Sequence, residues 1–236
     1  MSKKIIIFFG PPGSGKGTQA EMLAQKTDWK KISTGDLFRA EIAAGTKLGK
    51  LSDKYVRSGK LMPDKATLSL VERSLKQKVS GFIFDGFPRN QHQLNNLLVI
   101  FKKALKKNDQ VYAIEVAVSD KEVKQRLSQR RMCACGKVYH LFYNTPINAG
   151  ICDICGGKLF IRNDDKPKVI TDRLKLYHVE SEPILDYWQK QGSPHEIRSG
   201  RSEAISRSKL IKINGEQPIK KIHEEIMEKL KELKLI

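Results

Sequence analysis

The stretch GPPGSGKGT, residues 10–18, decides the fold of this chain. It follows KIIIFF at residues 4–9, an apolar run that predicts a buried strand. TQAEMLAQK at residues 18–26 comes next and predicts the start of a helix. In such a strand, loop and helix, successive backbone N–H groups point at phosphate oxygens, and the helix N-terminus adds partial positive charge. Residues 10–18 are therefore predicted to form a phosphate cradle.

The cradle departs slightly from the strict phosphate-binding pattern G-x-x-x-x-G-K-[ST]. Gly10, Gly15 and Lys16 are in place, but Gly17 follows the lysine and the hydroxyl arrives one residue later, at Thr18. The alternative is a Gly/Pro-rich turn that happens to precede a lysine, and the flanking strand and helix argue against it. We predict binding of a nucleoside triphosphate with Mg²⁺, with Lys16 supplying a point charge to the β- and γ-phosphates.

Strand-like runs recur along the chain and alternate with helical patterns. Besides residues 4–9, strands are expected at residues 81–86, 111–118 and 209–214. Residues 66–78 and the tail after Pro218 carry apolar side chains at helical spacing. The alternation predicts an α/β P-loop fold, with a parallel sheet of about five strands covered by helices on both faces.

Composition and charge limit the class of protein. With 39% hydrophobic and 30% charged residues, the 236-residue chain is expected to be globular with one sizeable core. The apolar run at residues 5–9 is too short for a signal peptide or a membrane span, so we expect a cytoplasmic protein without a membrane partner.

The formal net charge of +18 raises the question of a polyanionic partner. Basic blocks lie at residues 102–107 and 198–212 and in the C-terminal helix. Lysines dominate them and aromatic residues do not interleave, which argues against a base-stacking surface, so we expect solvated faces and no nucleic acid. The polar, basic stretch at residues 191–209 is expected to be a loop or insertion, without an assigned role.

A second group of polar residues follows the strand expected at residues 81–86, in GFIFDGFPR. Asp85 ends this strand, where an open parallel sheet places its ligand crevice, and a carboxylate there can hold Mg²⁺ through water. Arg89 can reach an anion in the same crevice. If the chain is helical here, Gln93 shares a face with Arg89 and can read an amide or a ring edge.

The stretch ISTGDLFRA, residues 32–40, has two interpretations. Ser33, Thr34 or Asp36 can each begin a helix as its N-cap. Beside a phosphate cradle, however, Arg39 also becomes a candidate clamp for a second anion.

Four further arginines flank the cysteine-bearing stretch: Arg126, Arg130, Arg162 and Arg173. The first two are four residues apart and are predicted to share one helical face. Acids available for simple salt bridges are Asp164, Asp165 and Asp172. The alternative to salt bridges is bidentate gripping of phosphate, which suits the planar guanidinium group.

All cysteines of the chain lie within one short stretch, at positions Cys133, Cys135, Cys152 and Cys155. CDICGG is a good zinc half-site, whereas CACG is one residue shorter than the usual spacing, which makes Cys133 the weaker ligand. Free thiols or disulfides are the alternatives, but in the expected compartment a four-cysteine cluster more often binds metal. We expect a structural four-thiolate zinc, although thiolates alone do not exclude iron or cobalt.

Together these stretches resemble the adenylate kinases, which interconvert ATP plus AMP with two ADP. GPPGSGKGT, STGDLFR, DGFPRNQHQ, RLSQRR and RNDD with TDR occur in that family's order and cover nearly the whole chain. The long segment between Arg130 and Asp165 is similar to the long lid of the zinc-carrying bacterial forms. The resemblance implies a Mg²⁺-dependent phosphotransferase with ATP and AMP as partners, and we expect a monomer.

The resemblance also implies domains and site residues. Residues 1–32, 63–128 and 166–236 would form the core, residues 33–62 an AMP-binding insertion, and residues 129–165 the lid. The implied catalytic residues are Lys16, Asp85, Arg89, Arg126, Arg130, Arg162 and Arg173. The implied ATP-binding residues are Gly13, Ser14, Gly15, Lys16, Gly17, Thr18, Arg130, Val138, Tyr139 and Gln217. The implied AMP-binding residues are Thr34, Arg39, Lys60, Leu61, Met62, Gly86, Phe87, Pro88, Arg89, Gln93, Arg162 and Arg173.

Two other functions remain open from the sequence. One is a related nucleoside monophosphate kinase with another donor, such as GTP with AMP. The other is a basic zinc-ribbon ATPase that binds nucleic acid, which the net charge of +18 would favour.

Overall fold

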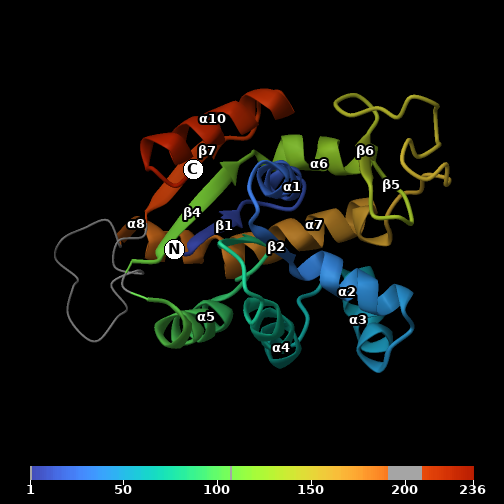
Figure 1. The fold of residues 1–236 in the computed structure, drawn as a ribbon. Helices are drawn as coiled ribbons and strands as arrows, with labels where there is room; N and C mark the ends of the chain where they lie inside the picture. The colour runs from blue at the N-terminus through green and yellow to red at the C-terminus, as the bar shows by residue number, and fades with distance from the viewer. Residues whose placement is uncertain (1, 107, 191–208) are drawn as a thin grey trace.

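The computed structural model describes residues 2–106, 108–190 and 209–236. In these ranges, one parallel sheet has the strand order β2 (Lys30–Ser33), β3 (Gly81–Asp85), β1 (Lys4–Phe9), β4 (Gln110–Ala117), β7 (Leu210–Asn214) (Figure 1). The expected α/β fold with a five-stranded parallel sheet is confirmed. β1 lies at the centre, so the loop after it opens in the middle of the sheet's carboxyl edge.

Successive side chains of β1 point to opposite faces of the sheet and are buried on both, so helices must cover both faces. The helices against the sheet are α1 (Lys16–Lys26), α4 (Asp64–Leu75), α5 (Gln91–Ala104), α8 (Pro183–Lys190) and α10 (Ile219–Glu232). Ile5 and Ile7 are buried in a cluster with residues of α4, α5 and α8. Ile6 and Phe8 point the other way, into a cluster with residues of α1 and α10. Burial on both faces is the reason the strand is apolar at every position after Lys4.

The strands expected from sequence are present, with ends that differ by at most one residue at each end. Within this sheet, β2 is the strand that the sequence did not reveal, because it has four residues, KKIS, of which the first two are lysines. It is an edge strand that pairs with β3 through Ile32 and Ser33 near the ligand edge. Its placement depends on tertiary pairing, since its local pattern is too short to predict a strand.

A small helical pair follows β2. α2 (Thr34–Ala43) and α3 (Lys47–Ser58) pack closely, and a Cβ atom at Gly49 would lie 2.0 Å from the carbonyl oxygen of Glu41. Only a glycine allows this approach. Ser33 is the N-cap of α2 and accepts a hydrogen bond from the backbone N–H of Asp36 at 3.4 Å, in agreement with the expected cap.

A flap projects from the core between α6 (Asp120–Gln129) and α7 (Pro167–Leu176). It contains the antiparallel pair β5 (Arg130–Met132) and β6 (Val138–His140), and it returns through the short helix η1 (Asn163–Asp165). The expectation that Arg126 and Arg130 share a helical face is wrong, because α6 ends at Gln129 and Arg130 pairs with His140 as a strand residue. The two flanking helices, α6 and α7, pack together through Val123, Leu127, Ile170 and Leu174.

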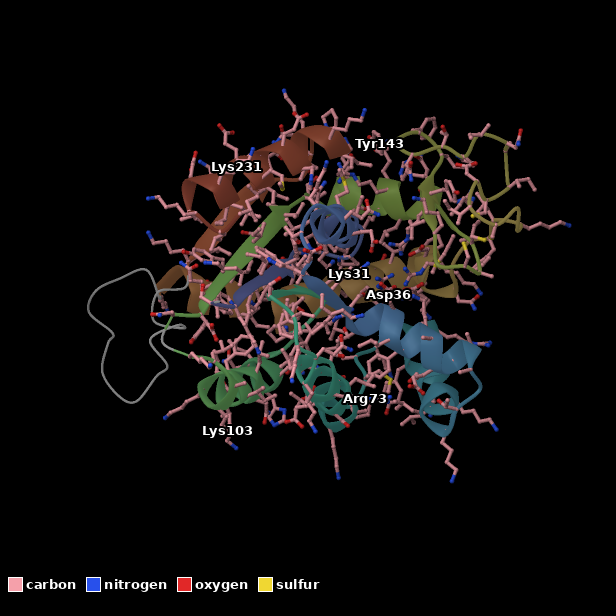
Figure 2. All side chains as sticks on the ribbon, in the orientation of Figure 1. Lys31, Asp36, Arg73, Lys103, Tyr143 and Lys231 are labelled. Atoms are coloured by element: carbon pink, nitrogen blue, oxygen red, sulfur yellow. The ribbon has the colours of Figure 1, made fainter. Side chains whose placement is uncertain are left out.

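Charge and hydropathy of the described residues give two further observations. Basic side chains are spread over the molecule: Lys103 and Arg73 lie on one side of the view and Lys231 on the other (Figure 2). No helix in the described ranges has both the length and the apolar character needed to cross a membrane. The basic stretch at residues 191–208 lies outside the described residues.

The helix η2 (Tyr177–Ser181), a π-helical segment, joins α7 to α8.

Candidate active site

The loop between β1 and α1 forms the cradle that the sequence predicts. Gly15 is the N-cap of α1 with φ of 93°, in the left-handed region where a side chain is strained. The ammonium of Lys16 donates a hydrogen bond to the carbonyl of Pro11 at 3.0 Å and so lies over the loop. The hydroxyl of Ser14 is buried and has no hydrogen-bond partner among the described residues. A buried donor of this kind at a helix N-terminus suits a phosphate oxygen.

Asp85 lies against the cradle because β3 is the neighbour of β1. Its carboxylate is so close that a Cβ atom at Gly17 would lie 3.0 Å from Oδ2. This approach explains why glycine follows the lysine where the strict motif has a hydroxyl residue. Carboxylate oxygens are the donors that Mg²⁺ prefers in proteins, so the residues present fit a magnesium ion bound together with phosphate.

The electrostatics of Lys16 connect the cradle to a second group of cations. Burial lowers the pKa of Lys16 from 10.5 to about 7. The carboxylate of Asp85 acts in the opposite direction, and the charges of Arg89, Arg173 and Arg130 lower the pKa further. An anion at the cradle would reverse this balance and keep the ammonium charged.

This lowered pKa predicts a pH-dependent difference in stability between the chain and its Lys16→Met variant. Between about pH 7 and pH 10.5 the unfolded chain binds the Lys16 proton and the folded chain does not, so raising the pH favours the folded state. Below pH 7 both states are protonated and the cost of the buried charge is fully present. We expect the variant to be the more stable protein at about pH 7, with an advantage that shrinks by on the order of 2 kcal/mol by about pH 9. Urea unfolding of both proteins measures it, and an advantage independent of pH would contradict the lowered pKa.

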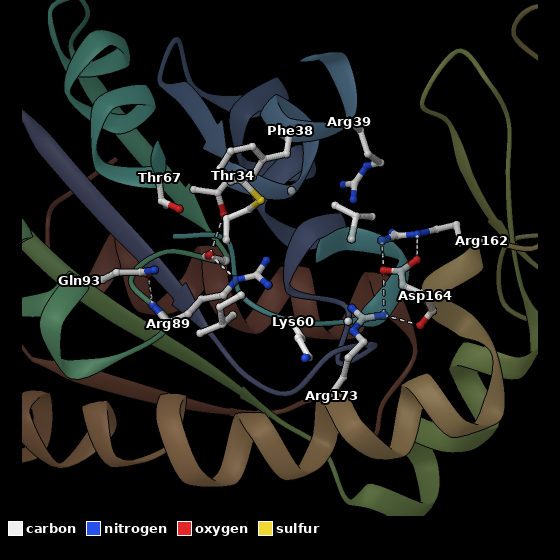
Figure 3. Close-up of a pocket in the computed structure, with 16 residues that line it drawn as sticks. Thr34, Phe38, Arg39, Lys60, Thr67, Arg89, Gln93, Arg162, Asp164 and Arg173 are labelled. Atoms are coloured by element: carbon white, nitrogen blue, oxygen red, sulfur yellow. Dashed lines mark hydrogen bonds and ion pairs between the residues drawn. The ribbon is translucent and has the colours of Figure 1, made fainter. Parts of the chain in front are cut away.

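A second pocket opens next to the cradle between α2, α3 and the end of β3 (Figure 3). Its lining residues are Thr34, Gly35, Phe38, Arg39, Val56, Gly59, Lys60, Leu61, Met62, Thr67, Gly86, Arg89, Gln93, Arg162, Asp164 and Arg173. Ten of the twelve residues implied for AMP line it. Phe87 and Pro88 do not; Phe87 is buried in the core. Phe38, Val56 and Thr67 were missed from sequence, because their place in the pocket depends on how α2, α3 and α4 pack.

The two ends of this pocket differ in chemistry. Gln93 and Thr67 lie at one end, and Arg162, Asp164 and Arg173 lie at the other (Figure 3). Between them, Nε of Arg89 donates to the carbonyl of Gly86 at 2.6 Å. One end can therefore read hydrogen-bonding groups of a neutral ring, while the other carries cations for an anion.

Gln93 and Arg89 are arranged differently from the expectation. α5 begins at Gln91 with Asn90 as its N-cap, so Arg89 precedes the helix and the two side chains do not share a helical face. Instead, the backbone N–H of Arg89 donates to Oε1 of Gln93 at 2.9 Å. Arg39, at the other side of the pocket, pairs with Asp36, and its Nε is buried without an acceptor among the described residues.

Two flap arginines and Arg173 of α7 meet two buried aspartates. Asp164 pairs with Arg162 at 2.5 Å and with Arg173 at 3.0 Å. Asp165 pairs with Arg130 at 2.5 Å and with Arg173 at 3.4 Å. The salt-bridge interpretation is thus correct for these arginines, but three cations share two acids, so the cluster keeps net positive charge. Asp172, the third acid offered by the sequence, pairs with none of them in the described part of the chain.

Beyond the cradle, the residues implied for ATP and its phosphates come from α6, the flap and the loop after β7. Arg126 donates to the carbonyls of Ser14 at 3.4 Å and Gly215 at 2.9 Å, which places it at the cradle. The Gln217 side chain donates to the carbonyl of Asn214 at 2.9 Å. Val138 is exposed on the flap. The guanidinium of Arg126 lies 5.7 Å from the ring centre of Tyr143, a flap residue that the sequence did not single out.

Tyr139 lies inside the cysteine cluster. It is buried, donates from its hydroxyl to Sγ of Cys152 at 3.5 Å, and accepts a hydrogen bond from the backbone N–H of Asp153 at 2.8 Å. Its side chain therefore holds the cluster together, and contact of this residue with a nucleotide would have to come from its backbone.

The four cysteines converge. Their sulfur atoms all lie within 4.8 Å of one another, with Cys133 3.3 Å from Cys155 and Cys135 3.6 Å from Cys152. Four thiolates around one zinc ion would be about 3.8 Å apart, given zinc–sulfur bonds of about 2.3 Å. The short C-x-C spacing does not exclude Cys133, because Gly136 at φ of 92° lets the chain turn and its N–H donates to the carbonyl of Cys133 at 2.9 Å. The donor set fits a structural zinc.

Comparisons with known proteins agree with this geometry. The family model described as adenylate kinase matches residues 8–193. The chain belongs to the adenylate kinase family. It is 44% identical over 189 residues to the adenylate kinase of Methanothrix thermoacetophila, which covers 79% of this chain and 87% of that protein. It is 40% identical to the adenylate kinase of Methanosarcina barkeri, with 96% and 98% of the two chains covered.

The adenylate kinase of Acetivibrio thermocellus is 37% identical, with 98% and 99% covered. This breadth of similarity makes the chain a nucleotide-binding phosphotransferase. Membership of the adenylate kinase family also agrees with the phosphate cradle after β1 and with the four clustered cysteines of the flap.

Proposed function

We propose that the chain catalyses the reversible transfer of the terminal phosphoryl group from Mg²⁺-ATP to AMP, giving two ADP. The observation that carries this proposal is that two anion sites share one group of cations. Lys16 of the cradle lies within electrostatic reach of Arg89 and Arg173, which line the second pocket, and of Arg130, which begins the flap. An enzyme that moves a phosphoryl group between two nucleotides needs this arrangement, because both oligophosphate ends must meet in line.

On the donor side, residues 13–18 would bind the ATP phosphates through backbone N–H groups, with Lys16 on the transferring group. Asp85 would hold the magnesium ion through its water ligands, and the bound ion would neutralise charge on the β- and γ-phosphates. Arg126 lies at the cradle and close to Tyr143, where a nucleotide base could stack.

On the acceptor side, the pocket would hold AMP with its base at the Gln93 end and its phosphate at the arginine end. Arg39, Arg89, Arg162 and Arg173 supply the cations there. Phosphoryl transfer needs little covalent help from the protein, so this group of charges and the alignment of the two nucleotides would provide most of the catalysis.

Movement of two segments would bring these groups together. We propose that residues 33–62 and residues 129–165 move against the core formed by residues 1–32, 63–128 and 166–236. The flap is too small for a substantial core of its own, and four thiolates on zinc would make it a rigid body. Closing such a body over the phosphates would expel water, which would otherwise take the phosphoryl group.

Initial rates with purified protein test the proposed reaction. With Mg²⁺-ATP we expect ADP formation that requires AMP and yields two ADP for each AMP consumed. Replacing ATP by GTP, and AMP by GMP, CMP or UMP, distinguishes a related kinase with another pair of nucleotides. ADP formation without AMP, together with salt-dependent binding to DNA or RNA, would instead support the zinc-ribbon ATPase.

Arg39 provides a test of the acceptor site that leaves the cradle intact. Replacing Arg39 with Met is expected to raise the KM for AMP by about 10- to 100-fold, because a charge-assisted bond of about 1.5–3 kcal/mol is lost. The KM for ATP should change by less than a factor of three. An equal rise in both KM values would contradict a dedicated role of Arg39 at the acceptor phosphate.

A further inference from the structure

Asp64 is a partly buried carboxylate directly behind the second pocket. It is the first residue of α4 and does not line the pocket itself. Oδ1 accepts hydrogen bonds from Nε2 of Gln93 at 2.7 Å and from the side chain of Asn90 at 3.2 Å. Oδ2 lies 2.7 Å from Nδ1 of His92. Of these three partners, Gln93 is the one that lines the pocket, so Asp64 contacts the pocket through the carboxamide of Gln93.

The carboxamide of Gln93 is held at both ends by groups that cannot exchange roles. Gln93 is 2% exposed and lines the pocket. Its Oε1 accepts from the backbone N–H of Arg89, and its Nε2 donates to Asp64. A peptide N–H can only donate and an ionised carboxylate can only accept. Turning the amide over would place two donors against each other at Arg89 and two acceptors against each other at Asp64.

Asp64 remains an acceptor because it stays ionised. Partial burial acts to raise the pKa of Asp64, but the hydrogen bonds from Gln93, Asn90 and His92 outweigh it, so the pKa lies below its ordinary value. At neutral pH the carboxylate thus has no proton to donate to Gln93.

The two contacts leave one lone pair and one N–H group of the Gln93 carboxamide for a ligand, since a carboxamide has two of each. A 6-aminopurine presents an N–H donor beside a ring-nitrogen acceptor, which is complementary to that pair. A 6-oxopurine presents an acceptor beside a donor, which would fit only if the amide were turned over. A site whose polar groups are fixed discriminates far better than one whose groups can turn.

We propose that Asp64 is a positioning residue that, with the peptide N–H of Arg89, holds Gln93 in one orientation and thereby sets the preference for 6-aminopurine monophosphates over 6-oxopurine monophosphates. This inference rests on the proposed binding of AMP in the second pocket. Asp64 acts through Gln93 and does not touch the nucleotide.

The test compares kcat/KM for AMP and for IMP, with Mg²⁺-ATP as donor, in the parent protein and in Asp64→Asn. An Asn side chain can donate or accept, so the carboxamide of Gln93 would no longer be fixed. We expect the AMP/IMP ratio of kcat/KM to fall at least tenfold, mainly through a higher KM for AMP, with kcat for AMP within about threefold. Asp53→Asn is the matched control, since Asp53 on α3 pairs with the exposed Arg57 and does not line the pocket; its ratio should stay unchanged.

A purely structural role of Asp64 at the start of α4 would give a different result. The rates with AMP and IMP would then fall by the same factor and the ratio would be unchanged, which would overturn the inference. If Asp64→Asn does not fold, Asp64→Ser carries the same test, because serine is also favourable in a first helical turn and also both donates and accepts. A parent protein that makes no ADP from ATP and AMP would instead overturn the proposed function.

Discussion

Replacing Lys16 with Met is expected to lower kcat for ADP formation by about 10³-fold, in line with the loss of a preorganised charge at the transferring group. The methionine side chain has a similar length but carries no charge, so it cannot stabilise the negative charge that develops on the phosphoryl oxygens. The variant should fold, because burial makes the charged form of Lys16 unfavourable and lowers its pKa to about 7, and the substitution removes that charge. Initial rates at saturating ATP and AMP, together with thermal unfolding, measure both expectations.

Lys124→Met is the matched control for this variant. Lys124 lies on α6 and is exposed, so the same change of charge there should alter kcat by less than twofold. If Lys16→Met kept more than a tenth of the parent kcat, the cradle would not be where the transferred group lies.

Removing the zinc module should have the second-largest effect, on stability rather than on chemistry. Purified protein is expected to contain one zinc per chain, and Cys152→Ser is expected to lose it. Structural zinc sites contribute their binding free energy to folding, and one kcal/mol shifts the melting temperature of a chain this size by roughly 2–4 °C. We expect a fall of about 10 °C and rapid proteolytic cleavage within residues 130–162, with turnover still measurable at about 15 °C, because no cysteine takes part in the transfer.

Ile154→Ser is the control for this second prediction. Ile154 lies between Cys152 and Cys155 in sequence and is 70% exposed, so its replacement should leave zinc content and melting temperature close to those of the parent. Complete loss of activity in Cys152→Ser, with the flap still resistant to protease, would show a catalytic rather than a structural metal.

The sequence predicts the central part of the fold because the signals there are local. β1 is apolar at all but its first position, the glycine pattern follows it directly, and the α10 stripe repeats at helical spacing. β2 and the end of α6 could not be predicted in this way. β2 is a strand because Ile32 and Ser33 pair with β3, and α6 ends because Arg130 pairs with His140. Both depend on partners distant in the sequence.

The candidate site shows the same division. The position of Lys16 over the loop after β1 and the convergence of the four cysteines could be predicted from the spacing of these residues in the sequence. The direction of a side chain could not: Tyr139 points into the cysteine cluster, and Phe87 points into the core. The contacts of Asp64 and Tyr143 were also hidden, since each is made with a residue from another element, Gln93 and Arg126 respectively.

The most direct test of the account is a crystal structure with a bisubstrate inhibitor in which two adenosines are joined by five phosphates. We predict that the oligophosphate passes beside Lys16, with one adenosine in the pocket next to Gln93 and the other near Arg126. An oligophosphate bound away from Lys16, or two adenosines that both lie outside the Gln93 pocket, would contradict the claim that the cradle and the second pocket bring two nucleotides together.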